Sequence, residues 1–167
     1  TVVIAVAINH LKHCLIEQEF HLRAELLQTN RHLDASRLEL KAARDADFVI
    51  EAIVERLEPK KECFAKLDRF CPPHAILATN SSTLMNSQIA PSTKRPEKCV
   101  NMHYFFPPLV MKLVEVVKGQ WTTEETVEIT AEVTRRSGRE AVILRKELPG
   151  FLVNRILRAL VREAYYC

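Results

Sequence analysis

His103 and Glu115 are the two residues of this 167-residue chain whose types and surroundings first suggest chemistry. Both lie between Cys99 and Gly119, where a Pro-Pro break separates two apolar runs; His103 closes the first run and Glu115 lies inside the second. A carboxylate taken out of water must find a donor, reach solvent or be protonated. A histidine can be that donor, because one ring nitrogen donates while the other stays basic. Such a pair can remove a proton from a hydroxyl group while a hydride leaves the same carbon.

Whether the two side chains meet depends on how the chain turns. In a tight hairpin centred on Pro107 and Pro108, the histidine faces Lys112. Glu115 then lies about 10 Å further along the strand, at roughly 3.4 Å per residue. The residues alone therefore leave two interpretations open: a catalytic pair, or a satisfied histidine with a glutamate on a solvated strand face.

Strand and helix patterns alternate along the chain, which predicts βαβ units, a mostly parallel sheet and an α/β fold. Strands are expected at residues 1–8, 48–54, 75–78, 100–105 and 140–145. Helices are expected at residues 11–28, 34–44, 58–70, 85–90, 122–138 and 151–166.

Two of these helices carry local signals. In the helix at 58–70, Phe64, Leu67 and Phe70 share one face, which predicts that this face is buried. The helix before Gly138 opens with the sequence TTEE, in which Thr122 and Glu125 have the spacing of a capping box.

Polar residues follow three of the expected strands: Glu55 follows one, Asn80 to Ser82 follow the next, and His103 ends the third. In parallel α/β sheets, ligands bind beyond the carboxyl ends of the strands. These residues are therefore expected to share one crevice. The alternative is that they are ordinary turn residues, since turns favour Asn and Ser.

The composition excludes several classes of function. A net charge of +3 with scattered basic residues gives no nucleic-acid footprint. Five cysteines without a CxxC pair favour free thiols in a reducing compartment. The apolar opening TVVIAVAI is far shorter than a membrane span, so a soluble intracellular protein without a membrane role is expected. His10, His13, Cys14 and His21 lack the partners of a tetrahedral site, so no metal is expected.

Four segments carry a family resemblance: DADFVIEAIVE, ILATNSSTL, TKRPEKCVNMHYFFPPLVMKLVEVVKG and LPGFLVNRI. In this order and spacing they resemble the NAD-binding half of the 3-hydroxyacyl-CoA and 3-hydroxybutyryl-CoA dehydrogenases of fatty-acid metabolism. The resemblance implies a Rossmann-like domain over residues 1–148 and the start of a helical C-terminal domain at 149–167. It also implies NAD as cofactor, an acyl-CoA substrate and a homodimer in the full-length family. The implied compartment is the bacterial cytoplasm or the mitochondrial matrix.

The same resemblance implies roles for individual residues. His103 resembles the family's general base, and Glu115 the carboxylate that orients it. Ser82 and Asn154 resemble residues that hydrogen-bond the substrate oxygen and order the site. Among the cofactor-binding positions, Glu55 and Lys60 resemble residues near the nicotinamide ribose, and Asn80 lies beside the site.

This sequence departs from the family at two places. Phe106 stands where the family has an asparagine after the histidine, which is expected to block the pocket or remove a hydrogen bond. A dinucleotide site also needs a glycine-rich turn of the form G-x-G-x-x-G, and the chain has only three glycines and no such motif.

Two alignments of the opening residues stay open. In one, residues 1–5 are the family's second strand and Val6 replaces its ribose-binding acid. In the other, residues 1–4 are the first strand, with Ala5, Ala7 and His10 where glycines would stand. Both imply a fragment or a degenerate copy with a damaged phosphate site. The functional alternatives are therefore a dehydrogenase whose missing parts come from elsewhere, a non-catalytic binding or oligomerisation module, and a crystallin-like structural relative.

Overall fold

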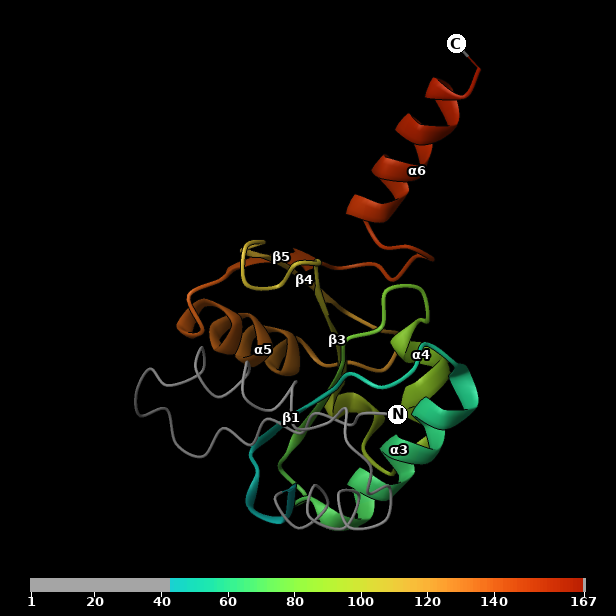
Figure 1. The fold of residues 1–167 in the computed structure, drawn as a ribbon. Coiled ribbons are helices and arrows are strands. Elements are labelled where there is room, and N and C mark those ends of the chain that lie inside the picture. Colours follow the sequence, from blue (N-terminus) through green and yellow to red (C-terminus); the bar gives the residue numbers. More distant parts are fainter. Residues whose placement is uncertain (1–42, 167) are drawn as a thin grey trace, which may run out of the picture.

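The computed structural model describes residues 43–166, and a five-stranded sheet lies at their centre (Figure 1). The strands run in the spatial order β1-β2-β3-β4-β5, and every neighbouring pair is parallel except the antiparallel pair β3 and β4. Their bounds are β1 (Phe48–Glu51), β2 (Ile76–Thr79), β3 (Cys99–Tyr104), β4 (Leu113–Val117) and β5 (Glu140–Leu144). The predicted mostly parallel α/β sheet is confirmed.

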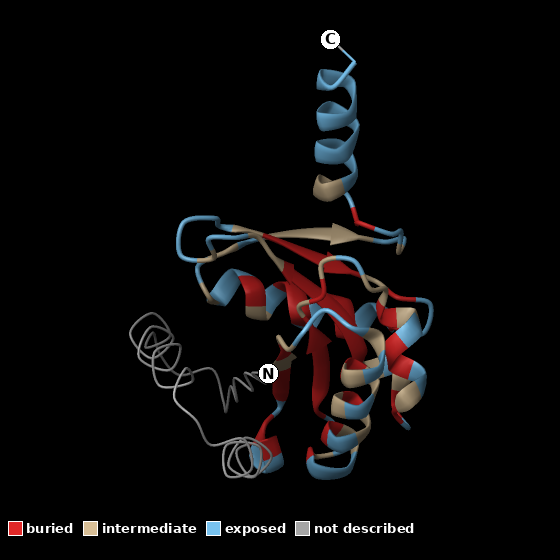
Figure 2. Cartoon of the chain, turned by 45° about the vertical axis from the view of Figure 1, so that its right-hand side comes forward, coloured by how far each residue is buried: buried red, intermediate tan, exposed pale blue. Residues whose placement is uncertain are grey.

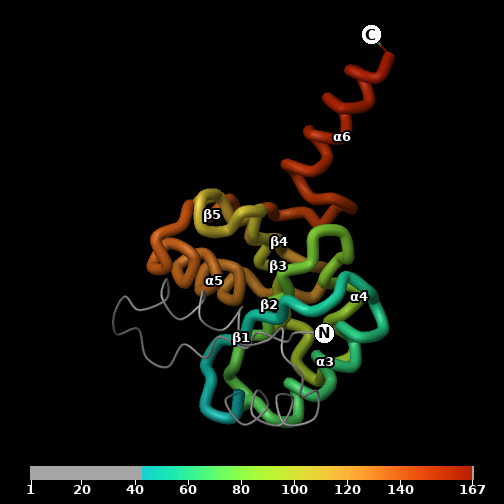
Figure 3. Tube along the Cα trace, viewed as in Figure 1, coloured from blue at the N-terminus to red at the C-terminus, as the bar shows by residue number. Residues whose placement is uncertain are grey.

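Helices cover both faces of this sheet. Their bounds are α3 (Leu57–Phe70), α4 (Asn86–Ile89), α5 (Glu124–Arg136) and α6 (Val153–Ala164), with short 3-10 turns at Ala43–Asp45, Ala90–Ser92 and Pro96–Lys98. Helices α3 and α4 lie on one face and α5 on the other, whereas α6 projects away from the sheet (Figures 1 and 3). None of the helices in residues 43–166 combines the length and apolarity that crossing a membrane requires.

The alternation of side chains along each strand divides the core into two layers. On the α5 side, Val100 and Met102 of β3 pack with Val127 and Ala131 of the helix. On the α3 side, Val49 of β1 packs with residues of α3 and of the neighbouring strands. Side chains on the same face of the sheet as Val49 therefore point toward α3 and α4. Figure 2 shows these buried strands between partly exposed helices, and the exposed α6 beyond them.

Helix α3 buries only part of its predicted apolar face. Phe64 and Leu67 are in the core, but Phe70, the last residue of the helix, is 37% exposed. Lys60 lies one turn before Phe64 on the same face and is 1% exposed. A charged side chain therefore takes the first position of this buried face.

The strand predicted over 48–54 ends earlier, at Glu51. Its side chain explains the end, because the backbone N–H of Ile53 donates to Glu51 Oε1 at 2.6 Å and so turns out of the sheet. The backbone carbonyl of Glu51 still accepts a hydrogen bond, from the N–H of Asn80 at 2.8 Å.

The predicted capping box of α5 is wrong by one residue. Thr123 is the N-cap, and its side chain accepts from the N–H of Thr126 at 3.2 Å. Thr122 is buried, and its hydroxyl instead donates to the backbone carbonyl of Cys99 at 2.6 Å, which ties this loop to β3. The other helices and strands predicted from residue 58 onward are found with shifts of one or two residues at their ends.

Predictions for the beginning of the chain fall outside the described residues. They comprise the strand at 1–8, the helix at 11–28, most of the helix at 34–44, the histidines at 10, 13 and 21, and both alignments of the missing glycine turn. The last residues of the 34–44 helix lie in the 3-10 turn Ala43–Asp45.

Candidate active site

His103 and Glu115 are directly opposite each other on β3 and β4. His103 Nδ1 lies 2.8 Å from Glu115 Oε2, and the two residues are 2% and 0% exposed. Both side chains point to the α3 side of the sheet, because Met102 and Val114 beside them point to the α5 side. The tight-hairpin alternative is therefore wrong: the turn is longer, and the carboxylate replaces Lys112 as the partner of the histidine.

The second oxygen of Glu115 binds the beginning of α6. The backbone N–H groups of Leu152 and Val153 donate to Glu115 Oε1 at 3.0 and 2.9 Å. Burial favours the neutral acid, but the hydrogen bonds from His103 and from these two N–H groups outweigh it and lower the pKa of Glu115. The side chain is therefore an ionised, fully satisfied carboxylate.

An ionised carboxylate can only accept hydrogen bonds, so the proton shared with His103 belongs to Nδ1. His103 Nε2 is then the basic nitrogen, and Ser82 Oγ lies 3.1 Å from it. The rings of Phe105 and Phe151 pack against the imidazole, with centroids 4.6 and 5.4 Å away. These contacts fix the ring so that Nε2 points to the turn after β2.

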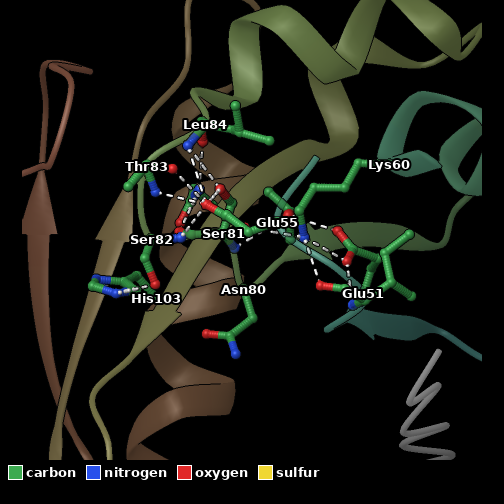
Figure 4. Close-up of polar contacts among 12 residues, drawn as sticks. Glu51, Glu55, Lys60, Asn80, Ser81, Ser82, Thr83, Leu84 and His103 are labelled. Atoms are coloured by element: carbon green, nitrogen blue, oxygen red, sulfur yellow. Dashed lines mark hydrogen bonds and ion pairs between the residues drawn. The ribbon is translucent and has the colours of Figure 1, made fainter. Parts of the chain in front are cut away.

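The turn that carries Ser82 is organised by one oxygen of Glu55 (Figure 4). Glu55 Oε1 accepts from the hydroxyls of Ser81 and Thr83, at 2.6 and 2.8 Å, and from the backbone N–H of Ser82, Thr83 and Leu84, at 3.0, 2.8 and 3.4 Å. Partial burial raises its pKa, but the hydrogen bonds from Ser81 and Thr83 and the charge of Lys60 outweigh that effect and lower it. Glu55 is therefore a charged centre around which residues 81–84 fold.

Behind this turn lies a buried ionic group formed by Glu51 and Lys60 (Figure 4). Lys60 Nζ is 2.7 Å from Glu51 Oε1 and 3.5 Å from Glu55 Oε2. The hydroxyl of Thr79 donates to Glu51 Oε2 at 2.7 Å. The ammonium is thus held between two carboxylates, one deep in the sheet and one at its edge.

The remaining predicted site residues differ in how they are engaged. Asn80 Oδ1 accepts from the backbone N–H of Tyr104 at 2.9 Å, which holds the end of β3 against the turn after β2. Asn154 lies in the first turn of α6, one residue after Val153, and its side chain makes no hydrogen bond to residues 43–166. Phe106 is 90% exposed in the loop after β3.

The structure thus gathers Glu55, Ser82 and His103 at the carboxyl ends of β1, β2 and β3, as expected. Sequence reasoning missed Glu51, Thr79 and the backbone of residues 152–153. The sequence does carry a signal for Glu51, because Glu51, like Glu115, is a carboxylate within an apolar strand. Within residues 43–166, no group of histidine, cysteine or acidic side chains could hold a metal ion.

A mostly parallel sheet covered by helices, with polar side chains gathered beyond its carboxyl ends, defines a Rossmann-like domain. Comparison with known proteins agrees with this class. Residues 7–148 match the family model described as "3-hydroxyacyl-CoA dehydrogenase, NAD binding domain". The chain belongs to this family.

Curated relatives match most of the chain. A "Probable 3-hydroxybutyryl-CoA dehydrogenase" of Bacillus subtilis is 46% identical over 128 residues, which are 77% of this chain and 44% of the relative. The "Hydroxyacyl-coenzyme A dehydrogenase, mitochondrial" of Homo sapiens is 42% identical over 118 residues, 71% of this chain and 37% of the relative. The chain therefore spans less than half the length of these relatives.

Solved structures give the same result. The crystal structure of a 3-hydroxybutyryl-CoA dehydrogenase from Escherichia coli has a TM-score of 0.72 and 38% sequence identity. The match covers 88% of this chain and 33% of that one.

Proposed function

We propose that this chain contributes the catalytic half-site for NAD-dependent interconversion of 3-hydroxyacyl-CoA and 3-oxoacyl-CoA in fatty-acid metabolism. The observation that carries the proposal is the placement of His103 between Glu115 and Ser82, at 2.8 and 3.1 Å. Membership of the dehydrogenase family supports it.

The imidazole is the proton acceptor in this proposal. Glu115 keeps the proton on His103 Nδ1, so Nε2 carries no proton and can take that of a substrate hydroxyl. As Nε2 becomes protonated, the ionised carboxylate stabilises the imidazolium. Ser82 Oγ lies beside Nε2, where its hydroxyl orients the substrate oxygen. In the reverse direction the same imidazolium returns the proton to a 3-oxo group.

A bound NAD would supply the acceptor for the hydride that leaves the same carbon. The described residues fit the reactive end of such a cofactor. The sheet edge where β1, β2 and β3 end carries a proton acceptor, a hydroxyl and the carboxylate of Glu55. For the pyrophosphate the sequence offers no glycine-rich turn.

Glu55, Lys60 and Asn80 complete the proposed cofactor side. Glu55 is 36% exposed in its side chain, whereas the ammonium of Lys60 lies behind it at 3.5 Å. In this assignment Glu55 faces the nicotinamide ribose, Lys60 supports the carboxylate, and Asn80 fixes the neighbouring strand end. Asn154 is assigned to the substrate side at the beginning of α6.

The relatives support a proposed substrate and compartment. An acyl-CoA is the proposed substrate, because relatives are named as dehydrogenases of 3-hydroxybutyryl-CoA and 3-hydroxyadipyl-CoA. We assign residues 149–167 to the start of a helical domain and propose that the full-length protein dimerises through this domain. The proposed compartment is the cytoplasm of a bacterium or the mitochondrial matrix.

Titration of the chain with NADH, followed by fluorescence, tests cofactor binding; oxidation of NADH by acetoacetyl-CoA tests the reaction. Saturable binding and turnover are expected. His103→Ala should abolish turnover and leave NADH binding in place.

His74→Ala is the matched control, because the side chain of His74 is 63% exposed and contacts Asp47 at the surface. This variant should behave like the unmodified chain. If a chain that circular dichroism shows to be folded binds no NADH up to millimolar concentration, the enzymatic proposal fails and a non-catalytic module remains.

A further inference from the structure

Glu51 is a fully buried carboxylate that the proposed reaction does not use. It is 0% exposed at the end of β1, and its carboxylate accepts hydrogen bonds from Ile53, Lys60 and Thr79, all outside the catalytic pair. Burying a charge is costly unless it is paired and hydrogen-bonded, and breaking such a pair is strongly destabilising. An apolar pair in place of Glu51 and its partner Lys60 would avoid that cost. The presence of two buried charges therefore requires an explanation other than stability.

The contacts of Glu51 lead step by step to the catalytic histidine. Glu51 Oε1 anchors Lys60 Nζ at 2.7 Å, and the ammonium faces Glu55 Oε2 at 3.5 Å. Glu55 Oε1 in turn holds the turn of residues 81–84, from which Ser82 Oγ reaches His103 Nε2 at 3.1 Å. The link between Glu51 and Lys60 is buried and the link between Ser82 and His103 is partly buried, whereas the hydrogen bond from the Ser82 N–H to Glu55 is exposed.

We propose that Glu51 is a positioning residue that sets Ser82 against His103 through Lys60 and Glu55. The anchor works because Glu51 is itself immobile: Thr79 holds its second oxygen, and the N–H of Ile53 holds the first. The ammonium is consequently fixed on one side of Glu55. Its charge attracts Glu55 Oε2 and so keeps Oε1 aimed at the turn. The catalytic relevance of this geometry rests on the proposed function.

Two measurements on the full chain test this proposal without requiring turnover. Amide hydrogen exchange reports the N–H groups of Ser82, Thr83 and Leu84, which donate to Glu55. The ¹⁵N chemical shift of His103 Nε2 reports the contact with Ser82.

In E51Q the ammonium of Lys60 loses its anchoring anion. Exchange at the three amides should rise at least about tenfold, while Ala131 in α5 keeps its protection. The Nε2 shift should move.

The matched control is E58Q. Glu58 lies in the first turn of α3, the helix that carries Lys60, but its side chain is 75% exposed and pairs with Lys61 at the surface. Exchange and chemical shift in E58Q should equal those of the unmodified chain. Equal behaviour of E51Q and E58Q would overturn the proposal, as would an equal rise in exchange at Ala131, since that reports global loss of stability.

A double variant separates positioning from stability and covers the case in which E51Q does not fold. E51Q/K60M removes both buried charges, so no unpaired ion remains. The double variant should fold, yet the three amides should exchange fast, because Glu55 has lost its cation. Return of these amides to their original protection would overturn the proposal. Absence of turnover in every variant would count against the proposed function alone, since neither measurement depends on activity.

Discussion

Glu115 and Val153 lie 38 residues apart in the chain, yet the N–H of Val153 donates to Glu115 Oε1 at 2.9 Å. The opposite oxygen of the same carboxylate faces His103 Nδ1. One buried carboxylate therefore joins the end of the sheet to the start of α6 and fixes the tautomer of the histidine. Substitutions at Glu115 should disturb both the attachment of α6 and the tautomer of His103.

Glu115→Gln gives the sharpest form of this prediction. A glutamine has one accepting oxygen, so its NH₂ group must face either His103 or the N–H groups of 152–153. A buried donor left unpaired costs about 1–3 kcal/mol of unfolding free energy. If the amide nitrogen faces Nδ1, the proton moves to Nε2 and the base is lost. Turnover should then fall on the order of 10⁴-fold, as in triads with the wrong tautomer.

Urea unfolding, turnover and the ¹⁵N shifts of His103 measure these effects. E132Q is the control, because Glu132 is an exposed partner of Arg136 on α5. Its effect on stability should stay within about 0.5 kcal/mol. Unchanged ¹⁵N shifts in E115Q would contradict the assigned tautomer.

Stability should depend on pH through the same carboxylate. The pKa of Glu115 is below the ordinary value of 4.5 in the folded chain, so its contribution is fully present above pH 4.5. The contribution is lost as pH falls through the folded pKa. The difference in unfolding free energy between the unmodified chain and E115Q should therefore shrink as pH falls from 7 to below 4.5. Urea midpoints at several pH values measure it, and a constant difference would contradict the lowered pKa.

Ser82→Ala should separate the hydroxyl from the turn that carries it. The backbone N–H of Ser82 still donates to Glu55, so the turn should keep its shape. Only the hydroxyl beside His103 Nε2 is lost. Turnover should fall on the order of 10²-fold, the usual effect of removing one donor at a reacting oxygen.

Exchange of the Thr83 amide checks that the turn is intact in this variant. Ser87→Ala is the control, because Ser87 contacts Glu147 through its backbone N–H and not through its hydroxyl. Equal turnover in S82A and S87A would remove Ser82 from the reaction.

The alternation of strands and helices made the sheet predictable, but the register of β3 and β4 was not. The loop between them is longer than the two prolines indicated. Val110 and Met111 donate back to the carbonyl of Pro107, and Arg139 donates to the carbonyls of Pro108 and Met111. This arginine precedes β5 and is remote in sequence. A contact of this kind cannot be read from the loop's own residues.

The candidate site also combines residues that could be predicted from the sequence with contacts that only the tertiary fold creates. The types of His103, Glu115 and Ser82 could be read from strand ends and from the family resemblance. The donors at 152–153 could not, because backbone N–H groups carry no sequence signal and approach Glu115 only through the tertiary fold. Glu51 had the same apolar-strand signal as Glu115, but nothing in the sequence pairs it with Lys60, which lies nine residues later on α3.

Phe106→Asn introduces the asparagine that the family resemblance implies at this position. The ring is 90% exposed, so its replacement should change the free energy of unfolding by less than about 0.5 kcal/mol. An added amide can donate or accept one hydrogen bond, worth about 0.5–1.5 kcal/mol, which corresponds to at most a roughly tenfold lower Kd. Fluorescence titration with NADH and with acetoacetyl-CoA measures that change. Leu109→Asn, in the same loop and 54% exposed, is the control for added polarity. If F106N alone binds more tightly than the unmodified chain, Phe106 weakens binding in this chain. If F106N and L109N bind with equal affinity, the amide at position 106 makes no hydrogen bond to the ligand.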